Sequence, residues 1–274
     1  GSGLGHVPAL AGAAMQFRPN TLWIDEEPDL YERRALPRFD PSHPVRRFTK
    51  EMLEACDAAF GRDVVLGGEH LLDPVTILSM MRGPAALCID LVEAPDEARR
   101  WIRALGDLYV ECKREDRRIR EGLGRLDDFH PMGVWADGMV EAIQCDFCTM
   151  LSPDMFREFV RPEAEREAAA VDYPFWHLDG TAEFVHLPAI CAIPNIRAIQ
   201  WVDEQRGRSP VEHVEQWKKV RAAGKGLLIA TEVGEAVELT RRLGPDGLAF
   251  RLADVGSVDD LDAALDALKK AGGR

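Results

Sequence analysis

A carboxylate and two thiols follow an apolar run in the stretch IQCDFCTMLSP, residues 143–153. Ser152 followed by proline is typical of a helix start, because the serine side chain accepts a hydrogen bond from the first turn and proline suits the first helical position. Asp146 is therefore expected on a loop between a strand and a helix, with Cys145 at the end of the strand. There the carboxylate can act as a general base or a metal ligand, and Cys145 can line the site. Cys148 is expected to be incidental.

A histidine and an aspartate lie two residues apart in the stretch FWHLDG, residues 175–180. If this segment is a strand, His177 and Asp179 point to the same side of the sheet, and Gly180 allows the turn that follows. An imidazole beside a carboxylate can hold a divalent metal ion or act as an acid–base pair. A structural hydrogen bond that closes the turn is the alternative interpretation.

Further polar and aromatic side chains fall near expected strand ends. Glu69 and His70 follow a pair of glycines, Trp201 ends an apolar run, and Trp23 precedes an acidic cluster. Acids interleaved with tryptophans suit a cationic or aromatic small molecule. We therefore expect substrate contacts from Glu69, Cys145, Trp201 and Trp23.

The elements that must position these residues alternate between short strands and helices. In the second half of the chain, four apolar runs each precede a segment of helix length, and they cover residues 174–177, 198–201, 227–230 and 248–251. Such alternation predicts parallel strands with right-handed crossovers, as in a doubly wound sheet or a (β/α)₈ barrel. Neither common Gly-rich phosphate-binding motif occurs in the chain, which favours the barrel. In such a barrel the chemistry lies at the carboxyl ends of the strands.

The first half of the chain is less regular. The patterns there predict a helix over 46–60, a strand over 64–68, a long helix over 95–122, and strands over 132–135 and 142–145.

The first 45 residues are rich in proline and charge, with one strand candidate at 21–24. The total of about six or seven strands falls short of the eight that a closed barrel needs. We expect one barrel domain over residues 1–274, with 1–45 as an irregular N-terminal segment and part of the N-terminal barrel missing from this chain.

Composition excludes several classes of partner. The net charge of −13 repels phosphate backbones and anionic lipid, and no apolar run reaches the roughly 18 residues of a membrane span. Six scattered cysteines do not form the dense framework of a secreted disulfide protein, and no targeting segment is recognisable at the N-terminus. We expect a cytoplasmic protein with a small-molecule substrate and no nucleic acid or membrane partner. Assembly into a homo-oligomer is left open.

Three passages resemble the uroporphyrinogen decarboxylase-like superfamily, which includes porphyrinogen decarboxylases and zinc- and corrinoid-dependent methyltransferases. Residues 71–102 are similar to the family segment in which an aspartate, Arg-Gly, Leu-x-x-Asp-Leu and a Pro-Asp pair lead into a long helix. In 144–162, Asp146 lies on the family's aspartate before Leu-Ser-Pro. HLDG, residues 177–180, lies where many methyltransferase-type members carry a histidine, a cysteine two residues later and a glycine. The resemblance extends from about residue 60 to the C-terminus and implies a (β/α)₈ barrel.

The methyltransferase side of this superfamily implies a metal. In those members a zinc ion held by histidine and cysteines activates an acceptor thiol, so the resemblance implies His177 and Asp179 as zinc ligands and a corrinoid protein as partner. Asp179 replaces the family's cysteine, and fewer thiolates leave the metal more electron-poor. An alternative ligand set is His177, Asp179 and one of Cys145, Asp146 or Cys148. The resulting hypothesis is metal-dependent methyl transfer between a small molecule or corrinoid and an acceptor, with Asp146 and His177 as catalytic residues.

Two alternative functions stay open. In a metal-free decarboxylase of the porphyrinogen type, Asp146 and His177 would shuttle a proton to the carbon that loses CO₂. Residues 1–45 lack the arginine motif of that group, and no histidine follows His213. The third hypothesis is a catalytically inactive ligand-binding barrel.

Overall fold

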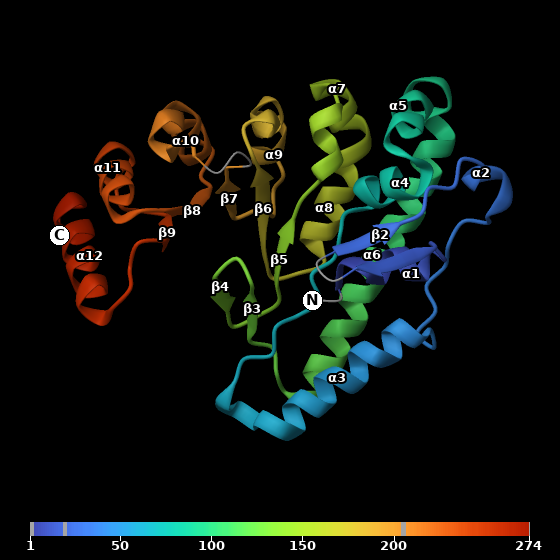
Figure 1. Cartoon of the computed structure of the whole chain (residues 1–274), viewed down its shortest axis with the longest axis horizontal. Helices are drawn as coiled ribbons and strands as arrows, with labels where there is room; N and C mark the ends of the chain where they lie inside the picture. The colour runs from blue at the N-terminus through green and yellow to red at the C-terminus, as the bar shows by residue number, and fades with distance from the viewer. Residues whose placement is uncertain (1–2, 19–20, 204–206, 274) are drawn as a thin grey trace. The chain divides into compact units, whose positions relative to one another are not determined.

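The chain is described here from a computed structural model that covers residues 3–18, 21–203 and 207–273 (Figure 1). The secondary structure is mixed α/β, as predicted. Two compact units divide the chain, Gly1–Pro174 and Phe175–Arg274, called unit 1 and unit 2 below.

Unit 1 is built mainly of helices, and five of those in the described residues begin with proline, where the missing N–H is not needed. Asp73 caps one of them by accepting hydrogen bonds from the N–H groups of Val75 and Thr76. The longest ends at Gly124, whose φ of 64° closes the last turn. The helices are α1 (His6–Leu10), α2 (Leu30–Arg33), α3 (Pro44–Phe60), α4 (Pro74–Arg82), α5 (Pro84–Glu93), α6 (Pro95–Leu123), α7 (Pro153–Met155) and α8 (Arg161–Ala169). A π-helical turn, Phe156–Val160, joins the last two.

The described strands of unit 1 are short. Two antiparallel hairpins pair β1 (Met15–Arg18) with β2 (Thr21–Ile24) and β3 (Asp128–His130) with β4 (Val134–Ala136). Strand β5 (Val140–Ile143) follows and is buried along its whole length. The first half of the chain thus departs from the uniform βα units of the expected barrel, because its hairpins pair strands antiparallel.

The strand predicted over 64–68 was wrong. A 3₁₀ turn covers Gly61–Asp63, and no strand follows before α4. The N–H of Gly68 donates to a carboxylate oxygen of Asp128 at 2.8 Å instead of to a neighbouring strand. Paired glycines have low strand propensity, so this side-chain bond prevails.

Unit 2 contains the parallel βα units that the periodicity predicted. Strands β6 (Tyr173–Asp179), β7 (Ala198–Val202), β8 (Gly226–Thr231) and β9 (Leu248–Leu252) pair in parallel in that order. The helices that follow them are α9 (Leu187–Cys191), α10 (Val214–Ala222), α11 (Val233–Leu243) and α12 (Val258–Ala271), which lie along one side of the strands in Figure 1. The parallel arrangement brings the carboxyl ends of β6, β7 and β8 to one edge. Closure into an eight-stranded barrel stays a prediction.

Among the described residues, no single helix combines the length and apolar character needed to cross a membrane. Helices α4 and α5 meet that criterion only as a pair, bent by 109°.

Candidate functional site

The structure divides the predicted site residues between the two units. Unit 1 contains Trp23, Glu69, Cys145 and Asp146, and unit 2 contains His177, Asp179 and Trp201. Their functional roles stay predictions, and the geometry of each unit is given separately below.

A pocket of about 930 Å³ opens at the carboxyl edge of the sheet in unit 2. Its lining includes the residues that end or directly follow three strands: Asp179 after β6, Asp203 after β7 and Glu232 after β8. Glu212 and Glu235 add two more carboxylates. Arg208 is the basic side chain among the described lining residues, so carboxylates outnumber cations five to one among them. The pocket therefore favours positively charged or hydrogen-bond-donating ligands.

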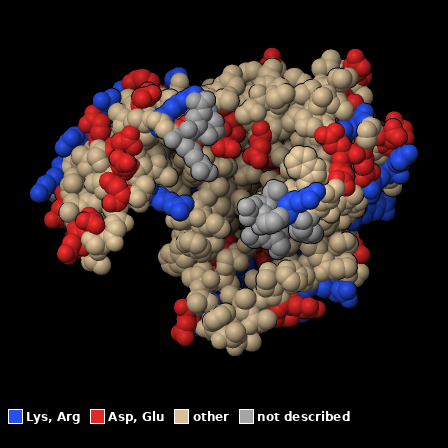
Figure 2. All heavy atoms as spheres, viewed as in Figure 1, with Lys and Arg blue, Asp and Glu red and all other residues tan. Residues whose placement is uncertain are grey.

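Three hydrogen bonds hold Asp203 and Arg208 in the pocket wall. The carboxylate of Asp203 accepts hydrogen bonds from the N–H groups of Gly207 and Arg208 at 2.6 and 2.7 Å. The guanidinium of Arg208 donates to the hydroxyl of Thr181. On the face seen in Figure 2, the described Lys and Arg residues are scattered among acidic ones instead of gathered in one basic patch.

A contact with Gln200 orients His177 in β6. Its Nδ1 lies 2.5 Å from Oε1 of Gln200, its register partner on β7. With the amide oxygen as acceptor, Nδ1 carries the ring proton, and in the neutral ring Nε2 presents a lone pair. Asp179 is exposed at the end of the same strand. The two residues could supply two metal ligands, but among the described residues they belong to no cluster of three ligand atoms.

The thiolates of the resembling methyltransferases have no counterpart in this pocket. Cys191, the cysteine of unit 2, lines a different cavity with Phe184 and Lys219. His177 and Asp179 thus do not complete a zinc site with the described residues around them.

The two tryptophans predicted to bind substrate lie in very different surroundings. Trp201 is 2% exposed and packs against His213 and Trp217, with ring centroids 5.6 and 5.4 Å away, although the residue is among those that line the pocket. Trp23 is 62% exposed on β2. Trp201 is therefore mainly a core residue, and Trp23 a surface one.

Asp146 and Cys145 lie where the sequence placed them, after β5. Asp146 is exposed at the start of a 3₁₀ turn, Asp146–Met150. Cys145 is fully buried, and burial raises the pKa of its thiol well above the usual value, so it stays neutral. Nearby, burial raises the pKa of Asp73 to about 7 in spite of its hydrogen bonds from Thr76.

Glu69 is engaged by its neighbours. Nη1 of Arg46 lies 2.7 and 2.6 Å from its two oxygens, and Nδ1 of His6 lies 3.1 Å from one of them. Burial alone would raise the pKa of Glu69, but His6 and Arg46 outweigh it and lower the pKa to about 2. The arrangement is that of a buried ion pair, so Glu69 has a structural partner already.

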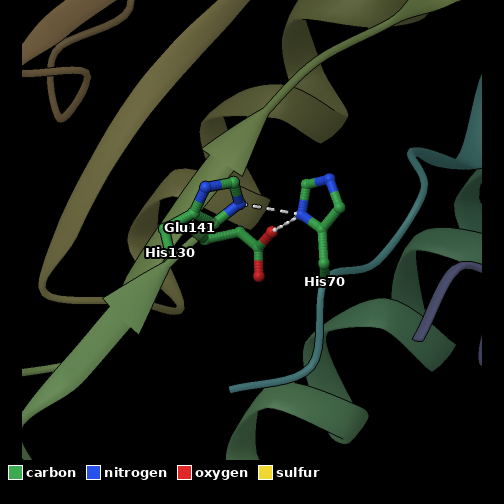
Figure 3. Close-up of side chains that lie close together, drawn as sticks. All are labelled: His70, His130 and Glu141. Atoms are coloured by element: carbon green, nitrogen blue, oxygen red, sulfur yellow. Dashed lines mark hydrogen bonds and ion pairs between the residues drawn. The ribbon is translucent and has the colours of Figure 1, made fainter. Parts of the chain in front are cut away.

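The sequence interpretation missed a second group of ionisable side chains in unit 1. His70 Nδ1 lies 2.8 Å from Oε1 of Glu141 on β5 and 3.0 Å from Nε2 of His130 on β3 (Figure 3). The other oxygen of Glu141 accepts a hydrogen bond from Lys113 of α6. Ligand atoms of the two histidines and Glu141 all lie within 4.8 Å of one another, so this group could hold a metal ion. One signal was visible beforehand: Glu141 is an acid inside the apolar run MVEAI, residues 139–143.

Comparisons with known proteins identify the fold. No family model matches the chain, and no curated protein matches it. Among solved structures it is similar to a methyltransferase from Methanosarcina mazei, with a TM-score of 0.65 and 15% sequence identity, over 97% of this chain and 78% of that one. At this identity the likeness is one of fold.

Proposed function

We propose that the chain is a barrel enzyme of the uroporphyrinogen decarboxylase-like superfamily that transfers a methyl group between a small molecule or corrinoid and an acceptor. Two independent likenesses support this. Three sequence passages resemble the superfamily, and the fold is similar to a methyltransferase along 97% of the chain. A corrinoid carried by a partner protein is the proposed methyl carrier.

The observation that carries the proposal is the position of the acidic pocket in unit 2. It lies at the carboxyl ends of β6, β7 and β8, the edge at which parallel βα folds place their chemistry. The side chains there are contributed by three successive strands. A fold match alone would not favour activity, because one fold serves many functions.

The charge of the pocket narrows the substrate class to a small cation, such as a methylated amine. Asp179 at the end of β6 and Glu232 after β8 would offset a positive charge on the methyl donor.

His177 is the proposed proton acceptor. Gln200 holds the ring through Nδ1, and the lone pair of Nε2 can take a proton from an acceptor group. Asp179 lies two residues further along the strand, at the pocket wall. No metal-dependent step is assigned to this pair, because the described residues around it do not supply a third ligand.

The test is a methyl-transfer assay with free cobalamin in place of the carrier protein. We would incubate the chain with a panel of methylated amines and cob(I)alamin, and follow methylcobalamin by its absorbance and the demethylated amine by mass spectrometry. Asp179→Asn should lower the rate, whereas Glu215→Gln should not, since Glu215 is an exposed acid of α10 that does not line the pocket.

Other results would replace the proposal. Release of CO₂ from acidic substrates without methyl transfer would favour the metal-free decarboxylase. Saturable binding of amines without turnover of either kind would favour a ligand-binding barrel.

A further inference from the structure

We infer that His70, His130 and Glu141 form a binding site for a divalent transition metal in unit 1. The site is separate from the His177–Asp179 pair that the sequence suggested as zinc ligands. It rests on the geometry of unit 1 alone and does not depend on the proposed methyl transfer.

The first argument is the spacing of the ligand atoms. A tetrahedral ion with bonds of about 2.1 Å holds neighbouring ligand atoms about 3.4 Å apart. The observed separations are 2.8 Å from His70 Nδ1 to Glu141 Oε1 and 3.0 Å from His70 Nδ1 to His130 Nε2. Side-chain shifts of about half an ångström would admit the ion at normal bond lengths. Figure 3 shows all three groups pointing toward one another.

The second argument is that protons alone cannot satisfy these contacts. The N–H of Met132 donates to Nδ1 of His130 at 3.2 Å, which places the proton of a neutral His130 on Nε2. That proton can be donated to Nδ1 of His70. The lone pair of His70 Nδ1 then accepts the proton of His130. The same nitrogen lies 2.8 Å from Oε1 of Glu141, and no proton is left between these two atoms. A cation bound by three lone pairs removes the conflict between His70 and Glu141, at the expense of the contact from the Met132 N–H to His130.

The third argument is the support behind Glu141. Lys113, which is 2% exposed, donates to its Oε2, so Oε1 is left pointing at the histidines. Such outer contacts fix the direction of a metal ligand.

The donor set indicates which metal would bind. Two imidazole nitrogens and one carboxylate oxygen suit Zn²⁺ and its neighbours Co²⁺ and Fe²⁺. The side chain of His70 is 25% exposed, which gives an ion a route from solvent. Three protein ligands leave a fourth position for water or a substrate atom, as in catalytic zinc sites.

Ion binding should change the tautomer of His130. Ligation through Nε2 moves the ring proton to Nδ1, so the contact from the Met132 N–H must break. Nitrogen-15 NMR of the histidine side chains reports this tautomer directly. Zn²⁺ should convert His130 from the Nε2–H to the Nδ1–H form in the wild-type chain, which needs no variant.

The main experiment is metal titration of the full-length chain after removal of metal with a chelator. The wild type should bind one equivalent of Zn²⁺ in the micromolar range or tighter, and Co²⁺ should give the intense visible bands of a four- or five-coordinate ion. His70→Ala should weaken binding by at least about 100-fold, since losing a ligand costs more than losing an outer contact. His177→Ala is the matched control and should bind Zn²⁺ as the wild type does.

Three results would overturn the inference. They are no Zn²⁺ binding by the wild type, unchanged binding by His70→Ala, and loss of binding in His177→Ala alone. Circular dichroism checks that each variant is folded. Because the readout is metal binding, failure of the methyl-transfer assay would leave this result intact, and the reverse is also true.

Discussion

The charged side chains discussed above are buried and paired in unit 1 but exposed in unit 2. In unit 1, Lys113 and Glu141 are almost fully buried and contact each other, and the buried Arg46 contacts Glu69. In unit 2, Asp179 and Glu232 are exposed at the edge of an open pocket.

This difference in burial predicts different effects of substitution, on stability in unit 1 and on ligand binding in unit 2. Burying a charge costs several kcal/mol, so each buried group of unit 1 needs its partners in place. The carboxylates of the pocket are shared with solvent, so replacing one costs little stability. We therefore expect substitutions in the unit 1 cluster to change the free energy of unfolding, and substitutions in the pocket to change ligand affinity.

The largest effect should come from Lys113→Met in metal-free buffer. Loss of the ammonium leaves Glu141 buried without its cation, which should lower the free energy of unfolding by about 3–5 kcal/mol. Urea unfolding measures it. Lys218→Met is the control, because its ion pair with Glu215 is exposed, and it should change stability by less than about 1 kcal/mol. Equal losses of unfolding free energy in the two variants would show that the buried ion pair of Lys113 is no more important for stability than an exposed one.

A second prediction concerns Asp73, a buried acid of unit 1. Its folded-state pKa of about 7 lies above the ordinary 3.8, so the folded protein holds the proton while the unfolded chain releases it. Wild-type stability should thus fall as pH rises from about 4 to about 7. At about three pK units, the loss is up to about 4 kcal/mol.

Asp73→Asn separates this effect from other titrations. Asparagine keeps the capping oxygen for Val75 and Thr76 but does not titrate. The variant should match the wild type near pH 4 and be more stable above pH 7, as measured by urea unfolding across that range. Parallel pH profiles for the two proteins would mean that Asp73 is charged in the folded state.

The third prediction compares two tryptophans from the sequence-based substrate set. Trp201→Ala should cost about 3 kcal/mol, since it empties a site packed by His213 and Trp217. Trp23→Ala should cost less than about 0.5 kcal/mol, because the side chain is 62% exposed. Thermal unfolding of both variants measures this. A large loss of stability in Trp23→Ala with none in Trp201→Ala would contradict the description of Trp23 as a surface residue and Trp201 as a core residue.

The smallest expected effect is on ligand binding by the pocket. Glu232→Gln should weaken the affinity for a small organic cation by roughly 5- to 10-fold, or about 1 kcal/mol, and the weakening should shrink as salt is added. Isothermal titration with a quaternary amine measures it, and Glu215→Gln is the control. Stronger binding by Glu232→Gln would show that the pocket prefers anions.

The sequence was informative wherever local chemistry decides the structure. The helix predicted over 95–122 is α6, and the predicted cap of Ser152 is present, with its Oγ accepting from Met155 N–H at 3.2 Å. The pocket edge was also predictable, because residues that follow parallel strands meet at one edge. The strand over 64–68 failed because a side-chain bond from Asp128 replaced strand pairing at Gly68.

The sequence did not indicate that the three residues of the metal site lie close together. His70 lies 60 residues from His130 and 71 from Glu141 in the chain. No periodicity connects positions so far apart, and a lone acid in an apolar run shows only that some partner must exist.

What the sequence by itself determined is therefore the set of elements, since periodicity, caps and glycine positions act between near neighbours in the chain. It also indicated that Asp179 lies at the end of a strand, which is where β6 ends. Tertiary packing alone decided that Trp201 is mainly core, that Glu69 is held by Arg46, and that two histidines converge on Glu141. The physical reason is that burial and ion pairing depend on which distant segments meet, and that is set by how the whole core packs.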